Sequence, residues 1–61
     1  MRYIINMPPE AFNYIYVVFM VDSANNAYFF YACNDYKEAI FYAKAYSNTR
    51  IQFVKNIKRC F

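Results

Sequence analysis

The segment 14–21, YIYVVFMV, is a run of hydrophobic residues with no polar interruption. β-branched and aromatic residues of this kind favour a strand, in which successive side chains point to opposite faces of the sheet. Both alternating sets are apolar in this run. The pattern therefore predicts a strand whose two faces both need to be covered.

A polar segment, DSANN at positions 22–26, separates this run from a second apolar run, AYFFYAC at positions 27–33. Asp, Ser and Asn are typical turn residues, so the pattern predicts a β-hairpin over residues 13–33. With five residues in the loop, Val21 lies opposite Ala27, and this pairing sets the register of the hairpin.

Residues 35–48 carry the signals of a helix. Asp35 and Glu38 have the spacing of a capping box, and the alanines that follow favour helix from about Tyr36 to Ser47. At 100° per residue, one helix face is expected to carry Tyr36, Ala39, Ile40, Ala43 and Tyr46. Phe41 falls on the opposite, polar side, where it is either a partner contact or a single exposed aromatic.

The two ends of the chain are less regular. Residues 1–12 form an arm in which YII at positions 3–5 can pair as an edge strand before two prolines interrupt pairing. Residues 49–61 form a C-terminal strand, expected over Arg50–Val54, and a basic tail. Lys55 breaks the alternation there, which indicates a bulge or a turn at Lys55–Asn56.

These elements predict one small α+β domain over residues 1–61 with the order β-β-α-β. A right-handed crossover after the second strand places the third strand beside the first. We therefore expect a three-stranded, mainly antiparallel sheet in the order 2-1-3, with one helix on one face.

The hairpin register divides the side chains into two faces. The set richer in β-branched residues is expected beneath the helix and consists of Ile15, Val17, Phe19, Val21, Ala27, Phe29, Tyr31 and Cys33. The other set is richer in tyrosine, which suits an interface. The candidate interface residues are Tyr14, Tyr16, Val18, Met20, Tyr28 and Phe30, with Phe41 on the helix. We expect a second copy of the chain to cover this face; the alternative is that the N-terminal arm folds back over it.

The composition of the chain limits the kinds of functional site that it can form. The chain has 61 residues, 15 of them Phe or Tyr, and it has neither His nor Gly. A chain of this size is marginally stable without a partner, a metal or disulfides. The residue set suits neither a zinc site nor a glycine-rich nucleotide loop, so we expect no metal and no cofactor. The run 14–21 is too short to span a membrane as a helix.

The cysteines and carboxylates have structural explanations. We expect Cys33 and Cys60 to be free thiols in a cytoplasm; the alternative is a bridge between them. Asp22 fits turn chemistry, Asp35 and Glu38 fit a helix cap, and Glu10 lies beside prolines. Without a histidine to act as a base, the sequence indicates a protein that is not an enzyme.

The distribution of charge supports nucleic-acid binding as an alternative function. The net charge is +3, and the last twelve residues contain Arg50, Lys55, Lys58 and Arg59 with no acidic residue. A basic segment beside exposed aromatic side chains is a combination that binds single-stranded nucleic acid by stacking and phosphate neutralisation.

Our main hypothesis is a small non-enzymatic, homodimeric module that binds a larger protein or ribonucleoprotein. Residues favoured by A/T-rich codons, Ile, Asn, Lys, Phe and Tyr, make up 32 of the 61 positions. This bias and the small size are typical of phage or mobile-element proteins in the cytoplasm of a bacterial or archaeal host. We therefore expect an inhibitor of a host or defence complex, in the manner of an anti-CRISPR protein.

Overall fold

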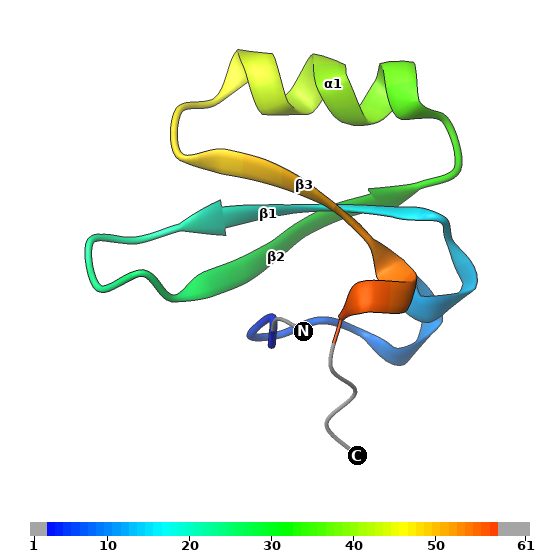
Figure 1. Cartoon of the computed structure of the whole chain (residues 1–61), viewed down its shortest axis with the longest axis horizontal. Helices are drawn as coiled ribbons and strands as arrows, with labels where there is room; N and C mark the ends of the chain where they lie inside the picture. Colours follow the sequence, from blue (N-terminus) through cyan, green and yellow to red (C-terminus); the bar gives the residue numbers. More distant parts are fainter. Residues whose placement is uncertain (1–2, 58–61) are drawn as a thin grey trace.

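A computed structural model describes residues 3–57 of the chain. Its elements are η1 (Pro9–Asn13), β1 (Tyr16–Val21), β2 (Ala27–Cys33), α1 (Tyr36–Ala45), β3 (Thr49–Phe53) and η2 (Val54–Asn56), where η denotes a 3-10 turn (Figure 1). The three strands form an antiparallel sheet in the order β2-β1-β3, with α1 packed on one face. The predicted α+β fold, strand order and helix are therefore confirmed.

The hairpin turn has the predicted register, because Val21 pairs with Ala27. The Asp22 carboxylate organises the turn by accepting hydrogen bonds from the backbone N–H groups of Ala24 (2.9 Å) and Asn26 (2.8 Å). Asn25 has a φ of 66°, a left-handed conformation that asparagine tolerates better than most residues. The chain thus makes this turn without glycine.

A β-bulge interrupts the hairpin further on. Val18 pairs with Tyr31 whereas Phe19 pairs with Phe29, so Phe30 is an extra residue in β2. Beyond the bulge, the face on which each side chain lies is reversed relative to a regular register. Tyr31 and Cys33 therefore lie on the same side as Val18, and their predicted placement with Val17 and Phe19 is wrong.

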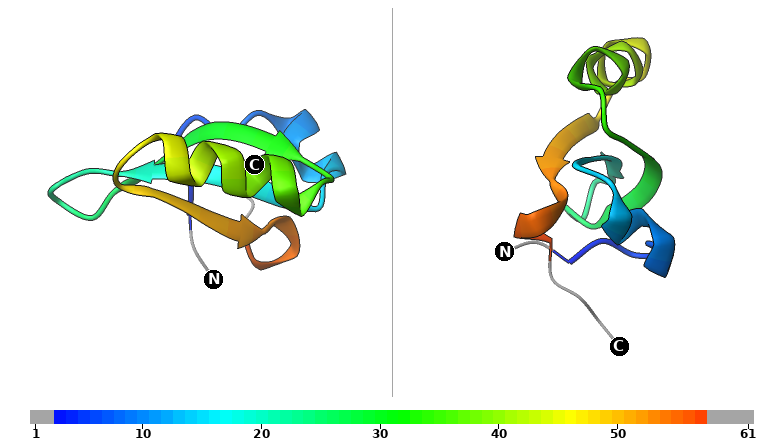
Figure 2. Two further views of the ribbon diagram at one scale, coloured as in Figure 1. Left: turned by 90° about the horizontal axis from the view of Figure 1, so that it is seen from above. Right: turned by 90° about the vertical axis from the view of Figure 1, so that its right-hand side faces the viewer.

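The helix covers the face that carries Val18, which is completely buried together with Ala39 of α1. Figure 2 shows α1 as a separate layer above the sheet. Ring contacts hold the helix to β2: Tyr42 lies 4.7 Å from Tyr31 and 5.7 Å from Phe30 between ring centroids. The prediction that the helix covers the β-branched set is therefore wrong.

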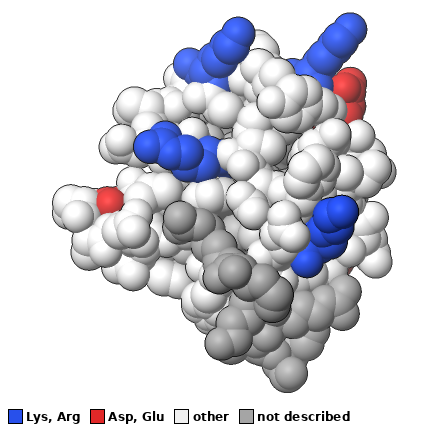
Figure 3. Space-filling model, in the orientation of Figure 1, with Lys and Arg blue, Asp and Glu red and all other residues white. Residues whose placement is uncertain are grey.

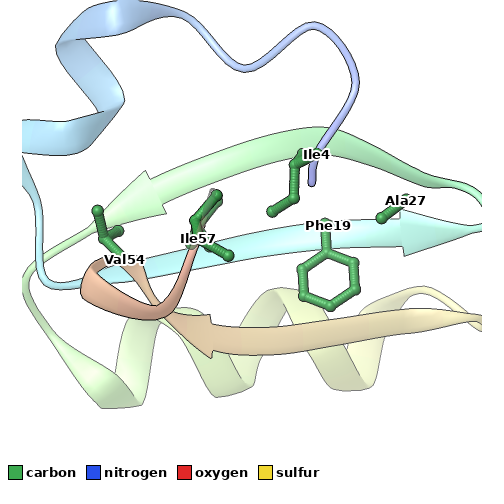
Figure 4. Packing of buried hydrophobic residues seen from close by; sticks show 6 residues of the cluster. Ile4, Phe19, Ala27, Val54 and Ile57 are labelled. Carbon is green, nitrogen blue, oxygen red and sulfur yellow. The ribbon is translucent and has the colours of Figure 1, made fainter. Parts of the chain in front are cut away.

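The opposite face, which carries Val17 and Phe19, is covered by the two ends of the described chain (Figures 2 and 4). Ile4 from the arm and Val54 and Ile57 from the C-terminal side pack there as aliphatic side chains. The arm thus folds back as the alternative had it, but over the face expected beneath the helix. The reason is complementarity: the inward side of α1 offers alanine and tyrosine, whereas the ends offer the aliphatic groups that pack between Val17 and Phe19.

The arm also pairs with the outer edge of β2. The Ile5 N–H donates to the carbonyl of Ala27 (2.8 Å), and the Phe29 N–H donates to the carbonyl of Ile5 (2.9 Å). This is a single parallel bridge rather than the edge strand that the sequence suggested.

The bounds of α1 and β3 differ slightly from those predicted. The helix ends at Ala45 rather than near Ser47, and Asn48, with a φ of 61°, leads the chain into β3. The strand is Thr49–Phe53, one residue earlier than expected, and the η2 turn follows at Lys55 and Asn56. The remainder of the predicted basic tail, residues 58–61, lies outside the described residues. Within residues 3–57, no helix is long and apolar enough to cross a membrane.

The burial of the arm generates a stability prediction. Ile4 is 3% exposed, and we expect Ile4→Ala to lower the free energy of unfolding by about 2–4 kcal/mol, since it removes three buried carbons and leaves a cavity. Phe41→Ala, at a side chain 66% exposed, is expected to change it by less than about 0.5 kcal/mol. Urea unfolding of both variants measures the difference; equal effects would contradict the covering role of the arm.

A second prediction concerns the Tyr31 hydroxyl, which donates a hydrogen bond to the Glu38 carboxylate. This bond, with lesser contributions from burial and from the negative charge of Glu38, raises the pKa of Tyr31 to about 12. A raised pKa in the folded state stabilises the fold below about pH 10, and this stabilisation is lost as the pH rises towards 12. We expect Tyr31→Phe to be less stable than the unmodified protein at pH 8 and to lose less stability between pH 10 and 12. Urea midpoints across this range test it; parallel pH profiles for the two proteins would refute it.

Candidate functional site

A pocket of about 430 Å³ opens where the start of α1 meets the paired ends of β1 and β3. Its lining consists of Tyr16, Tyr36, Ile51, Gln52 and Phe53. Four of these five side chains are hydrophobic or aromatic, and three elements contribute them. Pockets that combine apolar walls with a few polar groups are the usual form of a binding site.

The strand register brings two of the aromatic rings together. Tyr16 pairs with Phe53, and the neighbouring pair is hydrogen bonded through the Val54 N–H and the Ile15 carbonyl (2.9 Å). Tyr16 and Phe53 therefore form a non-hydrogen-bonded pair, the type in which opposed side chains lie closest. Their ring centroids are 5.4 Å apart at an interplanar angle of 31°.

The helix start adds a third ring. Asp35 caps α1 by accepting a hydrogen bond from the Lys37 N–H (3.0 Å), which fixes the first turn of the helix. Tyr36 is the first helical residue, and its ring centroid lies 5.3 Å from that of Tyr16. We call the three side chains Tyr36, Tyr16 and Phe53 the aromatic row.

The outer members of the aromatic row are largely open to solvent. Tyr36 is 52% exposed and Phe53 is 48% exposed, although both contact the half-buried Tyr16. At the other end of the helix, by contrast, Phe30 packs between Tyr42 and Tyr46. The row thus joins a fixed central ring to two accessible rings at the mouth of the pocket.

One described basic side chain, Lys55, contacts the aromatic row. The Lys55 ammonium lies 5.6 Å from the Phe53 ring centroid, within the range of a cation–π contact. The other described cations, Lys37, Lys44 and Arg50, are exposed. Figure 3 shows Lys and Arg side chains spread over the face on which β3 lies, with acidic groups only towards its margins.

Three of the described carboxylates have structural roles, and one of them, Asp35, directly precedes the pocket residue Tyr36. Glu38 accepts a hydrogen bond from Tyr31, and Asp35 caps the helix. The Asp22 carboxylate accepts backbone hydrogen bonds, of which the one from Asn26 has the largest effect, and these hydrogen bonds lower the pKa of Asp22. Within positions 3–57, no three residues among His, Cys, Asp and Glu are grouped so that they could hold a metal ion.

Cys33 lies in the interior beneath the helix, where its thiol is free. Burial is the main cause that raises its pKa, which favours the neutral thiol. This location agrees with the role of a small apolar filler. Cys60, its partner in the alternative bridge, lies outside the described residues.

The candidate interface residues do not form one exposed face. Val18 is completely buried, and Tyr16 and Phe30 are partly buried beneath α1. The remaining four are exposed at three places: Met20 and Tyr28 are paired across β1 and β2, Tyr14 precedes β1, and Phe41 lies on α1. The assignment of these residues to a single uncovered sheet face is therefore wrong, because both faces of the sheet are covered within the chain.

Two of the four candidate nucleic-acid residues can be placed. Arg50 lies on β3 and Lys55 beside Phe53, whereas Lys58 and Arg59 lie outside the described residues. Sequence reasoning missed Tyr36 and Phe53 as site residues. The available signal was the strand order: with β3 antiparallel to β1, the end of β3 must lie opposite the start of β1, where Tyr16 begins the strand.

Comparisons with protein-family models, with curated proteins and with solved structures find no match to this chain.

Proposed function

We propose that this protein is a non-enzymatic protein-binding module and that the aromatic row is the centre of its contact surface. The observation that carries the proposal is the pocket at the row, where Tyr36 and Phe53 stay about half exposed although the chain has folded around them. Tyrosine and phenylalanine are enriched in the cores of protein interfaces. Side chains anchored in pockets supply most of the binding energy in such interfaces.

The surroundings of the row support the same function. Ile51 adds an aliphatic wall and Gln52 a polar group, while the exposed Lys55 lies beside Phe53. An apolar centre with a polar, solvent-accessible rim is the usual anatomy of a protein interface. A complementary partner surface would carry acidic groups around an apolar centre.

The class of target, a host or defence complex, stays a prediction. A small module of this kind can act as an inhibitor by occupying a surface of a larger protein or ribonucleoprotein, and the composition favours a phage or mobile-element origin. Homodimerisation also stays a prediction, although dimerisation through an open sheet face loses its basis because both faces are covered.

Single-stranded nucleic acid is the second candidate partner. The specific observation in its favour is that Lys55 lies over the Phe53 ring at the end of the aromatic row. Stacked bases and a nearby cation are the elements with which many proteins hold single strands. Such binding would weaken steeply with salt, since each neutralised phosphate releases counterions.

The protein-binding proposal predicts the behaviour of Phe53→Ala in affinity capture from a low-GC bacterial lysate. We expect proteins retained by the immobilised full chain to be lost, with affinity reduced by about tenfold or more, as for a central interface residue. Tyr46→Ala is the matched control, because Tyr46 is 46% exposed and lies at the other end of α1. Circular dichroism checks that both variants fold.

Two results would contradict the proposal. One is a set of retained proteins that Phe53→Ala leaves unchanged. The other is that no protein is retained while the chain binds a dT20 oligonucleotide in a way that depends on both Phe53 and low salt. This outcome would indicate that the aromatic row binds single-stranded nucleic acid.

A further inference from the structure

We propose that the outer edge of β3 binds an extended acidic peptide segment of the partner as a fourth strand, with one large apolar side chain of that segment in the pocket. This inference rests on the proposed protein-binding function and specifies its mode and the chemistry of the partner. Three features of the described residues carry it: the direction of the β3 backbone groups, the position of the pocket and the distribution of charge.

The hydrogen bonds between β1 and β3 fix which backbone groups point outward. The Val21 N–H donates to the Asn48 carbonyl (2.8 Å), and the Val54 N–H donates to the Ile15 carbonyl (2.9 Å). In an antiparallel pair this parity directs the even-numbered residues of β3 towards β1. The backbone N–H and C=O groups of Thr49, Ile51 and Phe53 therefore point away from the sheet.

No described strand lies on that side of β3. The opposite edge of the sheet is different, because Ile5 of the arm forms two backbone hydrogen bonds with β2 there. On the β3 edge, the guanidinium of the exposed Arg50 donates a long, partly buried hydrogen bond (3.4 Å) to the carbonyl of Thr49, a residue that is 6% exposed. An unpaired edge of this kind is the surface to which extended peptides add as strands.

The pocket lies on the helix side of the same edge. Ile51 and Phe53, whose backbone groups point outward, also line the pocket with their side chains. Residues directly opposite one another on paired strands have their side chains on the same face. A residue of an added strand opposite Ile51 or Phe53 would thus place its side chain beside a volume of about 430 Å³, enough for a large aliphatic or aromatic group.

Charge specifies the partner further. Arg50 lies on β3 and Lys55 lies just beyond its end. On the face that carries β3, Lys and Arg side chains are spread across the surface, and acidic groups lie towards its margins (Figure 3). A carboxylate on the incoming segment can accept hydrogen bonds from the Arg50 guanidinium, while a backbone N–H of the segment donates to the Thr49 carbonyl in its place. Charge-assisted hydrogen bonds of this type are stronger than the neutral contact they replace.

A second copy of the chain fits the edge less well. Antiparallel pairing of two β3 strands centred on Ile51 places Ile51 opposite Ile51, and Thr49 of one copy opposite Phe53 of the other. The threonine is small and polar, so it would not fill the pocket at Phe53. The pairing also brings the two Arg50 side chains onto the same face, where their like charges repel. Nucleic acid would use the aromatic row but would leave the outward backbone groups without strand partners.

The test is selection of a displayed random decapeptide library against the full 61-residue chain. We expect enriched peptides to be acidic and to carry one large apolar residue in an otherwise alternating sequence. On binding, the amide resonances of Thr49, Ile51 and Phe53 should shift and their hydrogen exchange should slow. Methylation of alternate backbone nitrogens in a selected peptide should weaken binding by about tenfold or more, as the loss of two hydrogen bonds would.

A pair of proline variants tests the edge from the side of the protein. Ile51→Pro removes an outward N–H and is expected to reduce peptide affinity, since proline is compatible with an exposed strand edge. Gln52→Pro removes an N–H directed towards β1 and is expected to destabilise the sheet. The methylated peptides decide the question if Ile51→Pro does not fold.

The outcomes separate this inference from the proposed function. Peptides that tolerate methylation at every position, or that shift amides away from β3, overturn strand addition while protein binding stands. Failure to enrich any acidic peptide overturns it as well. Protection of the three β3 amides in a peptide-free dimer assigns the edge to a second copy. If the chain binds no library peptide and captures no protein in a Phe53-dependent way, the proposed function itself is overturned.

Discussion

The need to bury β1 on both faces is the constraint on which the rest of the structure depends. Val17 and Val18 are adjacent in the strand, point in opposite directions and are both completely buried. A single ten-residue helix can cover only one of these faces. The other cover comes from chain segments outside the regular elements, so the N-terminal arm and the η2 turn are parts of the core rather than appendages.

This arrangement also determines where the molecule stays open. The helix and both ends of the described chain cover the two faces, and the arm pairs with the edge of β2. Among residues 3–57, β3 has a strand partner on its inner edge and none on its outer edge. Aromatic packing closes one end of the helix through Phe30 and Tyr42. At the other end, Tyr36 and Phe53 flank Tyr16 without enclosing it, and the pocket lies there.

Polar side chains stabilise the turns between the secondary-structure elements, since the chain has no glycine. Within residues 3–57, asparagine occupies the three left-handed positions, Asn6, Asn25 and Asn48, where a residue with a larger or branched side chain would be strained. Asp22 and Asp35 satisfy backbone donors at the hairpin turn and at the helix start. These short-range roles can be predicted from the sequence, since each depends on neighbours within a few positions.

Local pattern determined the elements, their order, the hairpin turn and the exposure of Phe41, because strand alternation, turn residues and helix caps act over short distances. The covering of the faces was decided only by the tertiary structure. The extra residue Phe30 reverses the remainder of β2, and no local preference requires a bulge at that position. The aromatic row depends likewise on the pairing of Tyr16 with Phe53, residues distant in the chain. Contacts of this kind follow from how α1 and the chain ends fill space around β1, a property of the whole fold rather than of any segment.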